Sequence, residues 1–496
     1  MPHSPYALAE ATLPRLDAAI ARPLYDRSLL EASLVHIGAG SFNRSHLAVY
    51  LDDLLQQNPA RGERWAEVGV GIMPTDKDLH EALLAQDCLY GHLQMEDDAL
   101  SYRIIGSLLR HIFAPSATQS VLAAIADPQC RILSLTVTEG GYFQDAYGNF
   151  SLDNAILQHD LEQPASPFSW VGIAAEAAQR RRSTHGQPFT LLSCDNVQGN
   201  GKVARRALLG FAESLDPRLA RWIESNVSFP ASMVDRITPR TTEAHRDLVA
   251  ARFGLRDKAA VVSESFRQWV IEDEFAAGRP AWESLGVQMT SDVAPYEMTK
   301  MRLLNGGHSA LGYLADLLGM ETIAQAAVDP QLARLLAAFL DEVRPTVPRL
   351  PGLNLDEYTA SIQHRFANSA IGDQVSRICS EVCAKMARFL APSLRDLYNS
   401  GRSPKLLPLV VAAWLHYLRG TDESGRQMLI SDPQLKMLRP FFASAHRDTA
   451  AALLPIFGDL PRQHPQFVDT VEADLAQLRR DGVRATLAAL VPQVQG

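Results

Sequence analysis

The stretch LVHIGAGSFNRSH, residues 34–46, decides the fold of the first half of the chain. A short apolar run with strand character leads into Gly38-Ala39-Gly40, and an amphipathic helical pattern follows over residues 46–57. A strand, a Gly-x-Gly turn and a helix in this order place a pyrophosphate group at a helix N-terminus. Gly38 would allow the tight turn, and Gly40 would let the backbone approach the phosphates without an intervening Cβ. Asn43 stands where the usual fingerprint has a third glycine, so a plain tight turn is the alternative interpretation.

Short β-branched runs alternate with helical patterns through the first half of the chain. The runs lie at residues 34–38, 67–72, 131–138, 189–193 and 259–262. Such alternation predicts parallel strands with helices on both faces of the sheet. From about Pro295 the pattern is helical, for example over residues 331–343, 371–390 and 406–418. We therefore expect an α/β domain with a Rossmann-type doubly wound sheet, residues 1–286, and a mostly helical domain, residues 287–496.

Composition excludes several classes of protein. The chain has 496 residues, is 47% apolar, and carries 47 basic against 56 acidic side chains, a net charge of −9. A mildly acidic chain without a basic block is a poor binder of nucleic acid or of anionic membranes. Its five cysteines form no disulfide framework, and Cys379 and Cys383 alone cannot supply four zinc ligands. We expect a cytoplasmic protein with no secretory signal, no membrane span and no zinc site at these cysteines.

An acidic residue follows the second predicted strand. The strand ends at Gly71-Ile72, and Asp76 could accept hydrogen bonds from both ribose hydroxyls of NAD and would repel a 2′-phosphate. The alternative is that Asp76 caps the helix predicted over residues 78–84. Arg44, one turn into the first helix, could reach a phosphate or could be an exposed surface residue.

The stretch PYEMTKMRLLNGGH, residues 295–308, predicts a helix with unusual polar residues. Counting about 100° per residue from Glu297 places Lys300, Asn305 and His308 with it in one arc of about 140°, together with two leucines. The opposite side, which we expect to be the wetter face, carries Thr299, Arg302, Ser309 and Tyr313.

Burying these polar groups costs several kcal/mol unless they pair. One interpretation is a structural ion pair between Glu297 and Lys300. The other is a catalytic lysine whose pKa is lowered by desolvation, so that it acts as a base near neutral pH. Gly306-Gly307 costs roughly 1 kcal/mol per glycine in a helix, which indicates that a ligand or another element approaches the backbone closely.

Six long motifs carry a resemblance to a known family. They are HIGAGSFNRSHLAVYLDDLL (36–55), SLTVTEGGYF (134–143), LSCDNVQGNGKVARRALLGFAE (192–213), SMVDRITPRTT (232–242), SFRQWVIEDEFAAGRPAWESLGVQ (265–288) and PYEMTKMRLLNGGHSAL (295–311). From about Val35 to about Gly420 the chain resembles the long-chain polyol dehydrogenases typified by mannitol 2-dehydrogenase. D-arabinitol 4-dehydrogenases and the fructuronate and tagaturonate reductases are relatives.

The resemblance implies an active site between the two domains that uses NAD and no metal. With the glycine turn it predicts a cofactor site made of Gly38, Gly40, Ser41, Phe42, Arg44 and Asp76. It implies that Lys300 is the general base and that Asn196 and Asn305 bind the developing alkoxide, as in an oxyanion hole. It further implies that His308 orients the substrate, Glu297 leads the proton out and Glu139 gates that path. Its substrate-binding residues are Asp235, Arg377 and Lys385.

Simpler roles stay open for some of these residues. Asn196 lies in a turn-rich stretch and could serve the turn alone. Arg377 and Lys385, eight apart in the helix predicted over residues 371–390, could be surface cations. Related proteins often have a Gly-Ser segment before this lysine. Here the segment reads Ser380-Glu381-Val382-Cys383-Ala384-Lys385, and Glu381 would repel the carboxylate of a uronate.

We therefore predict a monomeric, NAD-dependent oxidation of an acyclic polyol to its ketose. Mannitol to fructose is the first expectation and D-arabinitol to D-xylulose the second. A hexuronate reductase remains an alternative within the family. A non-catalytic nucleotide-binding sensor and a zinc alcohol dehydrogenase are alternatives from other classes.

Overall fold

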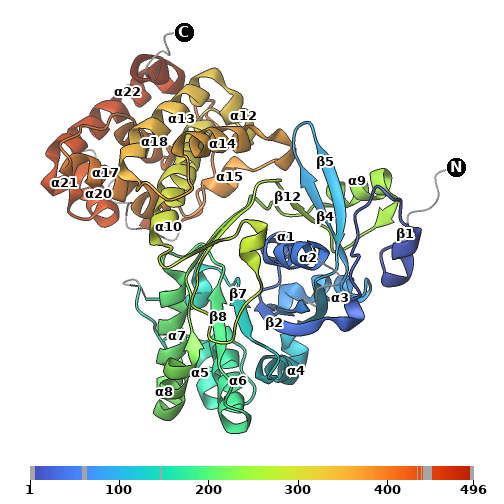
Figure 1. Cartoon of the computed structure of the whole chain (residues 1–496). Coiled ribbons are helices and arrows are strands. Elements are labelled where there is room, and N and C mark those ends of the chain that lie inside the picture. Colours follow the sequence, from blue (N-terminus) through green and yellow to red (C-terminus); the bar gives the residue numbers. More distant parts are fainter. Residues whose placement is uncertain are drawn as a thin grey trace. The chain divides into compact units, whose positions relative to one another are not determined.

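The computed structural model describes residues 6–57, 64–145, 148–432, 434–436, 438 and 449–491. The chain divides into two compact units, Met1–Ala294 and Pro295–Gly496. The division falls a few residues beyond the boundary expected from the sequence. Figure 1 colours the first unit from blue to yellow-green and the second from yellow to red.

The first unit is built on a six-stranded parallel sheet. Its strand order is β6-β3-β2-β7-β8-β9. The strands are β2 Glu31–Ile37, β3 Trp65–Gly71, β6 Leu108–Phe113, β7 Ile132–Leu135, β8 Phe189–Ser193 and β9 Val227–Ser228. In chain order this is 3-2-1-4-5-6, the order of dinucleotide-binding sheets, and its direction reverses between β2 and β7.

Alternate side chains of the central strands pack on opposite faces of this sheet. Val35 and Ile37 join the buried cluster made with helices α4 (Ala114–Ala126), α6 (Trp170–Thr184) and α7 (Asn200–Leu215). Leu34 packs on the other face, with Leu47 and Leu51 of α2 (Leu47–Gln57) and with Trp269. Successive side chains of a strand point to opposite faces of the sheet, so a continuous apolar run places apolar side chains on both faces. The sheet is therefore covered on both sides, as the alternation predicted.

A hairpin interrupts the expected alternation. Strands β4 (Tyr90–Met95) and β5 (Leu100–Ile105) lie between helix α3 (Lys77–Leu84) and β6, and they pair antiparallel. The run at residues 259–262 does form a strand, β12 (Val261–Ser263), but it pairs with β4 rather than with the main sheet. A third sheet holds β10 (Ser232–Asp235), β13 (Gln268–Glu272) and β14 (Gln288–Thr290), and the short strands β1 (Tyr6–Ala7) and β11 (Leu255–Arg256) pair with each other.

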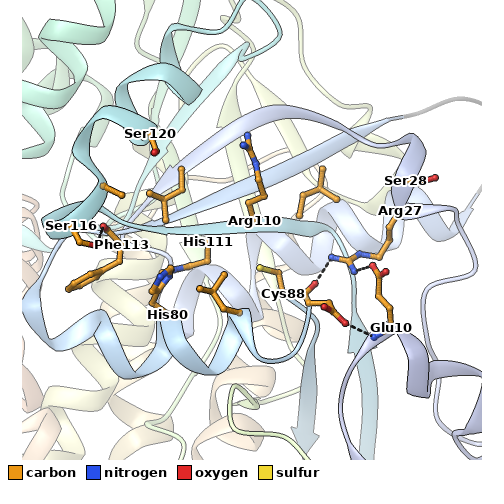
Figure 2. Close-up of a pocket in the computed structure, with 15 residues that line it drawn as sticks. Glu10, Arg27, Ser28, His80, Cys88, Arg110, His111, Phe113, Ser116 and Ser120 are labelled. Carbon is orange, nitrogen blue, oxygen red and sulfur yellow. Dashed lines mark hydrogen bonds and ion pairs between the residues drawn. The ribbon is translucent and has the colours of Figure 1, made fainter.

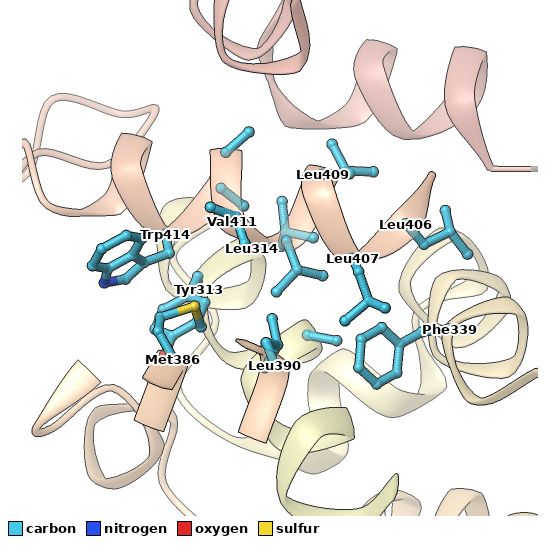
Figure 3. Close-up of a cluster of buried hydrophobic side chains, with 14 of the residues drawn as sticks. Tyr313, Leu314, Phe339, Met386, Leu390, Leu406, Leu407, Leu409, Val411 and Trp414 are labelled. Carbon is cyan, nitrogen blue, oxygen red and sulfur yellow. The ribbon is translucent and has the colours of Figure 1, made fainter. Parts of the chain in front are cut away.

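The second unit is a bundle of helices around one apolar core. Figure 3 shows Phe339 and Leu390 near Leu407 of the central helix, and Tyr313 and Met386 near Trp414 of the same helix. The main helices are α11 Gly306–Leu317, α12 Ile323–Val328, α13 Pro330–Val343, α14 Leu355–Ala367, α17 Ala391–Asn399, α18 Leu406–Tyr417, α20 Thr449–Phe457 and α22 Pro465–Leu490. Every residue of α18 is buried, as expected for a helix that is apolar all round. No helix in the described ranges is long and apolar enough to cross a membrane.

The buried N-terminus of α18 is capped by a distant carboxylate. The backbone N–H groups of Lys405, Leu406 and Leu407 donate to the two oxygens of Glu342, at 2.7, 3.0 and 2.8 Å. These bonds satisfy donors that the first turn of a helix leaves without intrahelical partners. A negative charge at that end also suits the helix dipole.

The single helix predicted over residues 371–390 is wrong. The chain forms two short helices, α15 (Val375–Ile378) and α16 (Val382–Lys385), and then a π-helical turn, Met386–Leu390. Glu381 separates the two helices in the left-handed region, with φ of +50°. Its N–H donates to the carbonyl oxygen of Ser431, at 3.0 Å, so contact with a remote segment overrides the local helical pattern.

Candidate active site

The glycine turn leaves the sheet at the point where its strand order reverses. Gly38 has φ of +88°, and a Cβ there would overlap the carbonyl oxygen of Thr136 and lie 2.9 Å from its carbonyl carbon. The hydroxyl of Thr136 also donates to the carbonyl oxygen of Gly38, at 2.7 Å. Only glycine fits this conformation and this close approach. The turn is thereby held between the ends of β2 and β7, where such sheets bind nucleotides.

Gly40 has a different reason to be glycine. Its φ of −82° suits any residue, and the nearest atom to an added Cβ would be the carbonyl oxygen of Gly38, at 3.7 Å. The protein leaves open space in front of Gly40, and this is the room that a pyrophosphate needs. Ser41 and Phe42, both partly exposed, begin the short helix α1 (Ser41–Ser45). The residues present at this turn therefore fit a dinucleotide.

The first helix is divided, contrary to a simple strand–turn–helix pattern. α1 ends at Ser45, the next residue His46 has a non-helical backbone, and α2 begins at Leu47. Arg44 is buried, donates to the carbonyl oxygen of Ala259 and lies over the ring of Tyr90, 5.3 Å from its centroid. Burial excludes the interpretation of Arg44 as an exposed surface residue. A contact between Arg44 and a phosphate remains a prediction.

Asp76 lies at the carboxyl end of β3, next to the glycine turn in the sheet. Its Oδ2 accepts a hydrogen bond from the N–H of Met73, at 2.9 Å. It makes no side-chain cap for α3 itself, but the bond from Met73 caps the 3-10 turn Pro74–Asp76 that leads into α3, so the capping interpretation holds in part. Gly71 gives it room, because a Cβ on Gly71 would come within 2.7 Å of the Asp76 Cβ. This placement suits recognition of a ribose, which remains a prediction.

A buried carboxylate, missed in the sequence, joins the ends of β7 and β8. Asp195 accepts hydrogen bonds from the N–H groups of Val137 and Thr138, at 3.0 and 2.9 Å, and from the hydroxyl of Tyr142, at 2.7 Å. Burial raises the pKa of Asp195 in spite of these donors. Thr138 has φ of +60°, a strained value for a β-branched residue, and Asp195 holds it there.

Two predicted site residues lie next to Asp195 and its hydrogen-bond partner Thr138. Asn196 follows Asp195 directly and is exposed, and Glu139 follows Thr138 and is also exposed. Asn200 supports the same loop, because its amide donates to the carbonyl oxygens of Asp195 and Ser232, at 3.0 and 2.8 Å. Asn200 therefore stabilises this turn, and the role of Asn196 remains a prediction.

Asp235, the last residue of β10, is 4% exposed and lies opposite Gln268 of β13. Its strand begins at Ser232, whose N–H donates to Asn200 Oδ1, at 3.0 Å. One hydrogen-bonded series therefore runs from the exit of β8 to the start of β10. The first unit brings Asn196 and Asp235 to neighbouring segments by this means.

In the second unit the predicted catalytic helix contains a π-helical turn. α10 (Ala294–Lys300) continues into the π turn Met301–Asn305 and then into α11. Glu297 and Lys300 are each 4% exposed and His308 is 8% exposed, whereas Asn305 is half-buried. π turns within helices are frequent at functional sites.

The π turn brings the four polar residues closer than a regular helix would. A π turn holds about one residue more than an α turn, so side chains beyond it lag by roughly 100°. The arc that spans Glu297, Lys300, Asn305 and His308 therefore narrows from about 140° to about 80°. The four side chains therefore share one side of the helix more closely than the sequence predicted.

The expected wetter face of this helix is wrong. Thr299, Arg302, Ser309 and Tyr313 are 2%, 7%, 1% and 0% exposed. Arg302 is satisfied internally, since it donates to the carbonyl oxygen of Thr346 and to the carboxylate of Asp396, both at 2.6 Å. Gly306 and Gly307 face α13 and α14, where Cβ atoms would lie 3.3 Å from Phe339 and 3.2 Å from Leu336. Another element, and not a ligand, explains this pair of glycines.

A second carboxylate that the sequence did not single out, Asp373, contacts two of the predicted substrate residues. Asp373 accepts two hydrogen bonds from the guanidinium of Arg377, at 2.7 and 2.6 Å, and its Oδ2 lies 3.8 Å from Nε2 of His308. The ring of His308 stacks on Phe366, with centroids 3.9 Å apart. Asp373 is buried, whereas the side chain of Arg377 is 59% exposed.

Lys385 reaches this cluster from the next short helix. Its Nζ donates to the carbonyl oxygens of Ile378, at 2.8 Å, and of Arg377, at 3.3 Å. A lysine that binds the last carbonyls of a helix is a common C-terminal cap. The break at Glu381 therefore lets Lys385 and Arg377 meet, although they do not share the single helix that the sequence predicted.

A large groove lies elsewhere in the first unit. It has a volume of about 720 Å³ and runs along β6, the edge strand of the main sheet. Figure 2 shows His80 and His111 on one side of this strand, with Nδ1 atoms 3.0 Å apart, and Arg110 on the other. None of the predicted site residues lines the groove. Size alone does not identify the active site here.

Comparisons with known proteins agree with this architecture. The family model of the mannitol dehydrogenase Rossmann domain matches residues 32–284, and that of the mannitol dehydrogenase C-terminal domain matches residues 292–479. The chain is 40% identical to a mannitol 2-dehydrogenase of Cereibacter sphaeroides over 475 residues, 94% of this chain and 98% of the relative. It is 39% identical to a D-mannonate oxidoreductase of Escherichia coli (strain K12) over 480 residues, 95% and 98% of the two chains.

Two solved structures share the whole fold. Pseudomonas fluorescens mannitol 2-dehydrogenase, solved as a ternary complex with NAD and D-mannitol, has a TM-score of 0.88 and 38% identity, over 98% of this chain and 99% of that one. A D-sorbitol dehydrogenase in substrate-free form has a TM-score of 0.89 and 36% identity, over 98% and 100%. The predicted fold class, a Rossmann-type domain followed by a helical domain, is confirmed. The chain therefore belongs to the mannitol dehydrogenase family, as its six motifs predicted.

Proposed function

We propose that this chain oxidises a secondary alcohol of an acyclic polyol to the ketose, with Lys300 as general base and without a metal. The chain is an NAD-dependent oxidoreductase, a conclusion supported by its family and by the NAD and D-mannitol in the related Pseudomonas fluorescens complex. D-mannitol to D-fructose is the reaction we propose first. The single observation that carries the proposal is the buried helix that groups Glu297, Lys300, Asn305 and His308.

The proposed chemistry needs a base, hydrogen-bond donors for an alkoxide and a hydride acceptor. Lys300 would take the hydroxyl proton in its neutral form, and would return it when the reaction runs toward the alcohol. The side-chain amides of Asn196 and Asn305 would donate to the alkoxide oxygen as charge develops on it. NAD bound at the glycine turn would accept the hydride that leaves the carbinol carbon. Glu297 would pass the proton toward solvent, with Glu139 gating that path.

The residues at the glycine turn and at the end of β3 would hold the cofactor. Gly40 leaves space for the pyrophosphate, and Ser41 and Phe42 offer backbone N–H groups at the start of α1. Asp76 would bind the ribose hydroxyls and select NAD over NADP.

The substrate residues favour a neutral polyol. His308 would orient a substrate hydroxyl, and Asp235, Arg377 and Lys385 would bind the rest of the chain. Asp373 already neutralises Arg377 through a bidentate pair, so this cation is a weaker site for a substrate carboxylate than a free arginine would be. A sugar-acid oxidoreductase is the second candidate, favoured by 39% identity to a D-mannonate oxidoreductase and by the two cations.

The test is an NADH absorbance assay on the purified full chain with a chelator present. Mannitol, D-arabinitol, sorbitol and mannonate are offered with NAD or NADP, and fructose and fructuronate with the reduced cofactors. Turnover of mannitol with NAD, unaffected by the chelator, is the expected result. Turnover restricted to the sugar acids would establish the second candidate, and loss of activity with the chelator would overturn metal independence. NADH binding without any turnover would point to a sensor.

A further inference from the structure

Two buried polar side chains meet beneath the glycine turn. Asn43, on α1, is 1% exposed, and Glu67, on β3, is 0% exposed. The amide nitrogen Nδ2 of Asn43 donates to Oε2 of Glu67 across 3.3 Å. The remaining oxygens, Oδ1 of Asn43 and Oε1 of Glu67, have no hydrogen-bond partner among the described residues.

Two buried acceptors without a donor are unfavourable, because each has lost its water and gained no bond. A carboxyl group that keeps its proton supplies the missing donor. We propose that Glu67 is a neutral carboxylic acid that forms a two-bond pair with the Asn43 amide, and that this pair positions α1 for the cofactor. In the second bond the Glu67 hydroxyl donates from Oε1 to Oδ1 of Asn43. Both orphan oxygens are then satisfied by one proton.

The surroundings of Glu67 favour the neutral form. Burial raises the pKa of Glu67 to about 8, although the Asn43 hydrogen bond and the charge of Arg44 oppose the rise. Arg44 gives its hydrogen bond to Ala259 and forms no ion pair with Glu67 in the described part of the chain. Tyr90 and Cys194 also interact electrostatically with Glu67. Burial raises the pKa of both side chains, so both stay neutral near pH 8.

Loss of the Glu67 proton would affect cofactor binding, an inference that rests on the proposed function. Glu67 lies opposite Leu34 of β2, three residues before the strand ends at Ile37, or about 10 Å from the glycine turn. Deprotonation removes the second bond and places a negative charge at that distance from a bound pyrophosphate. Two like charges about 10 Å apart, at an effective dielectric constant of about 20, weaken binding by roughly tenfold.

Glu67→Gln is the matched variant, because its amide can form the same two-bond pair at every pH. NAD dissociation constants of the parent and the variant are measured by calorimetry from about pH 6 to about pH 10, across the titration of Glu67. The parent should lose roughly tenfold in affinity over this range relative to Glu67→Gln. Equal pH profiles for the two proteins would overturn the positioning role.

Infrared difference spectroscopy tests the protonation state without any cofactor. The parent at neutral pH should show the carbonyl band of a protonated carboxyl group, which Glu67→Gln lacks. Asn43→Ala should keep the band but shift it, because the hydrogen-bond partner is gone. Absence of the band from the parent at neutral pH would refute the neutral pair. If neither protein binds NAD at any pH while the band is present, the proposed function fails and the pair stands.

Discussion

The two glycines of the turn after β2 should fail in different ways when each is replaced by alanine. Gly38→Ala places a Cβ that overlaps the carbonyl oxygen of Thr136, and it forces an alanine into a backbone conformation with φ of +88°. Gly40→Ala adds a Cβ whose nearest neighbour is 3.7 Å away, at φ of −82°. The first change should therefore damage the fold, and the second should damage cofactor binding alone.

The magnitudes follow from these two environments. For Gly38→Ala the positive φ costs about 1–2 kcal/mol and the overlap with Thr136 adds about 1–3 kcal/mol, which together lower the Tm by roughly 5–10 °C. For Gly40→Ala the backbone is compatible, so stability should change by less than about 1 kcal/mol. The added methyl group fills the space in front of Gly40, and a loss of at least about 1.4 kcal/mol in NAD binding is tenfold in Kd.

Thermal unfolding without ligand and calorimetric titration with NAD separate the two effects. The expected result is a lowered Tm for Gly38→Ala and a parental Tm with weak NAD binding for Gly40→Ala. Parental NAD affinity in Gly40→Ala would show that the open space is not the pyrophosphate site. Parental stability in Gly38→Ala would refute the steric account of the turn.

Four further changes test the site. Lys300→Ala should lower kcat by about 10²–10⁴-fold while NADH binding persists, and a near-parental kcat in stopped-flow turnover would exclude it as the base. Asp76→Ala should weaken NAD binding by roughly tenfold and NADP binding much less, so unchanged discrimination in titrations would mean that another residue reads the ribose. Asp373→Asn frees the Arg377 cation, and should raise kcat/KM for mannonate relative to mannitol several-fold; an unchanged ratio would contradict the neutralising role. Glu67 should make stability fall as pH rises from about 4.5 to about 8, because over this window the folded state holds a proton that the unfolded chain has lost. Glu67→Gln lacks this loss of stability, which reaches up to roughly 5 kcal/mol, so its Tm advantage over the parent should grow with pH and level off above about pH 8.

The sequence predicted those parts of the fold that depend on local pattern. The apolar runs at β2, β3, β7 and β8 are buried on both faces, and such runs are recognisable because strand burial needs no partner of a particular type. The hairpin β4–β5 was missed because its strands are half polar and lack the continuous apolar run of the buried parallel strands. The helix predicted over residues 371–390 failed because Glu381 is held by Ser431, fifty residues along the chain.

The π turn shows a different limit of sequence reasoning. Residues 301–305 have the same spacing of leucines that a regular helix would have, so periodicity alone gives no sign of the inserted residue. The turn nevertheless changes which side chains share a face. Lys300 and His308 move closer in angle. Thr299, the first residue of the expected wet face, precedes the turn and is buried all the same, so the shift in helical phase does not account for the burial of that face.

The residues that sequence reasoning missed at the site are carboxylates that act through their neighbours. Asp195 holds Val137 and Thr138, more than fifty residues away, and stands directly before Asn196. Asp373 holds Arg377 and faces His308 from the loop that precedes α15. Each is adjacent to a predicted functional residue in space. The partners of Asp195 lie far along the chain, so no spacing predicts them. Asp373 and Arg377 are four residues apart, a spacing that favours an ion pair on the predicted helix, and this signal was available in the sequence. A catalytic residue can be read from its motif, whereas the group that fixes its geometry is found from burial and hydrogen bonds. The Asn43–Glu67 pair is a further example of a group found from burial and hydrogen bonds. Glu67 is buried under the glycine turn without an ion pair among the described residues, and a proton on its carboxyl group would give both unpaired oxygens of the pair a hydrogen bond.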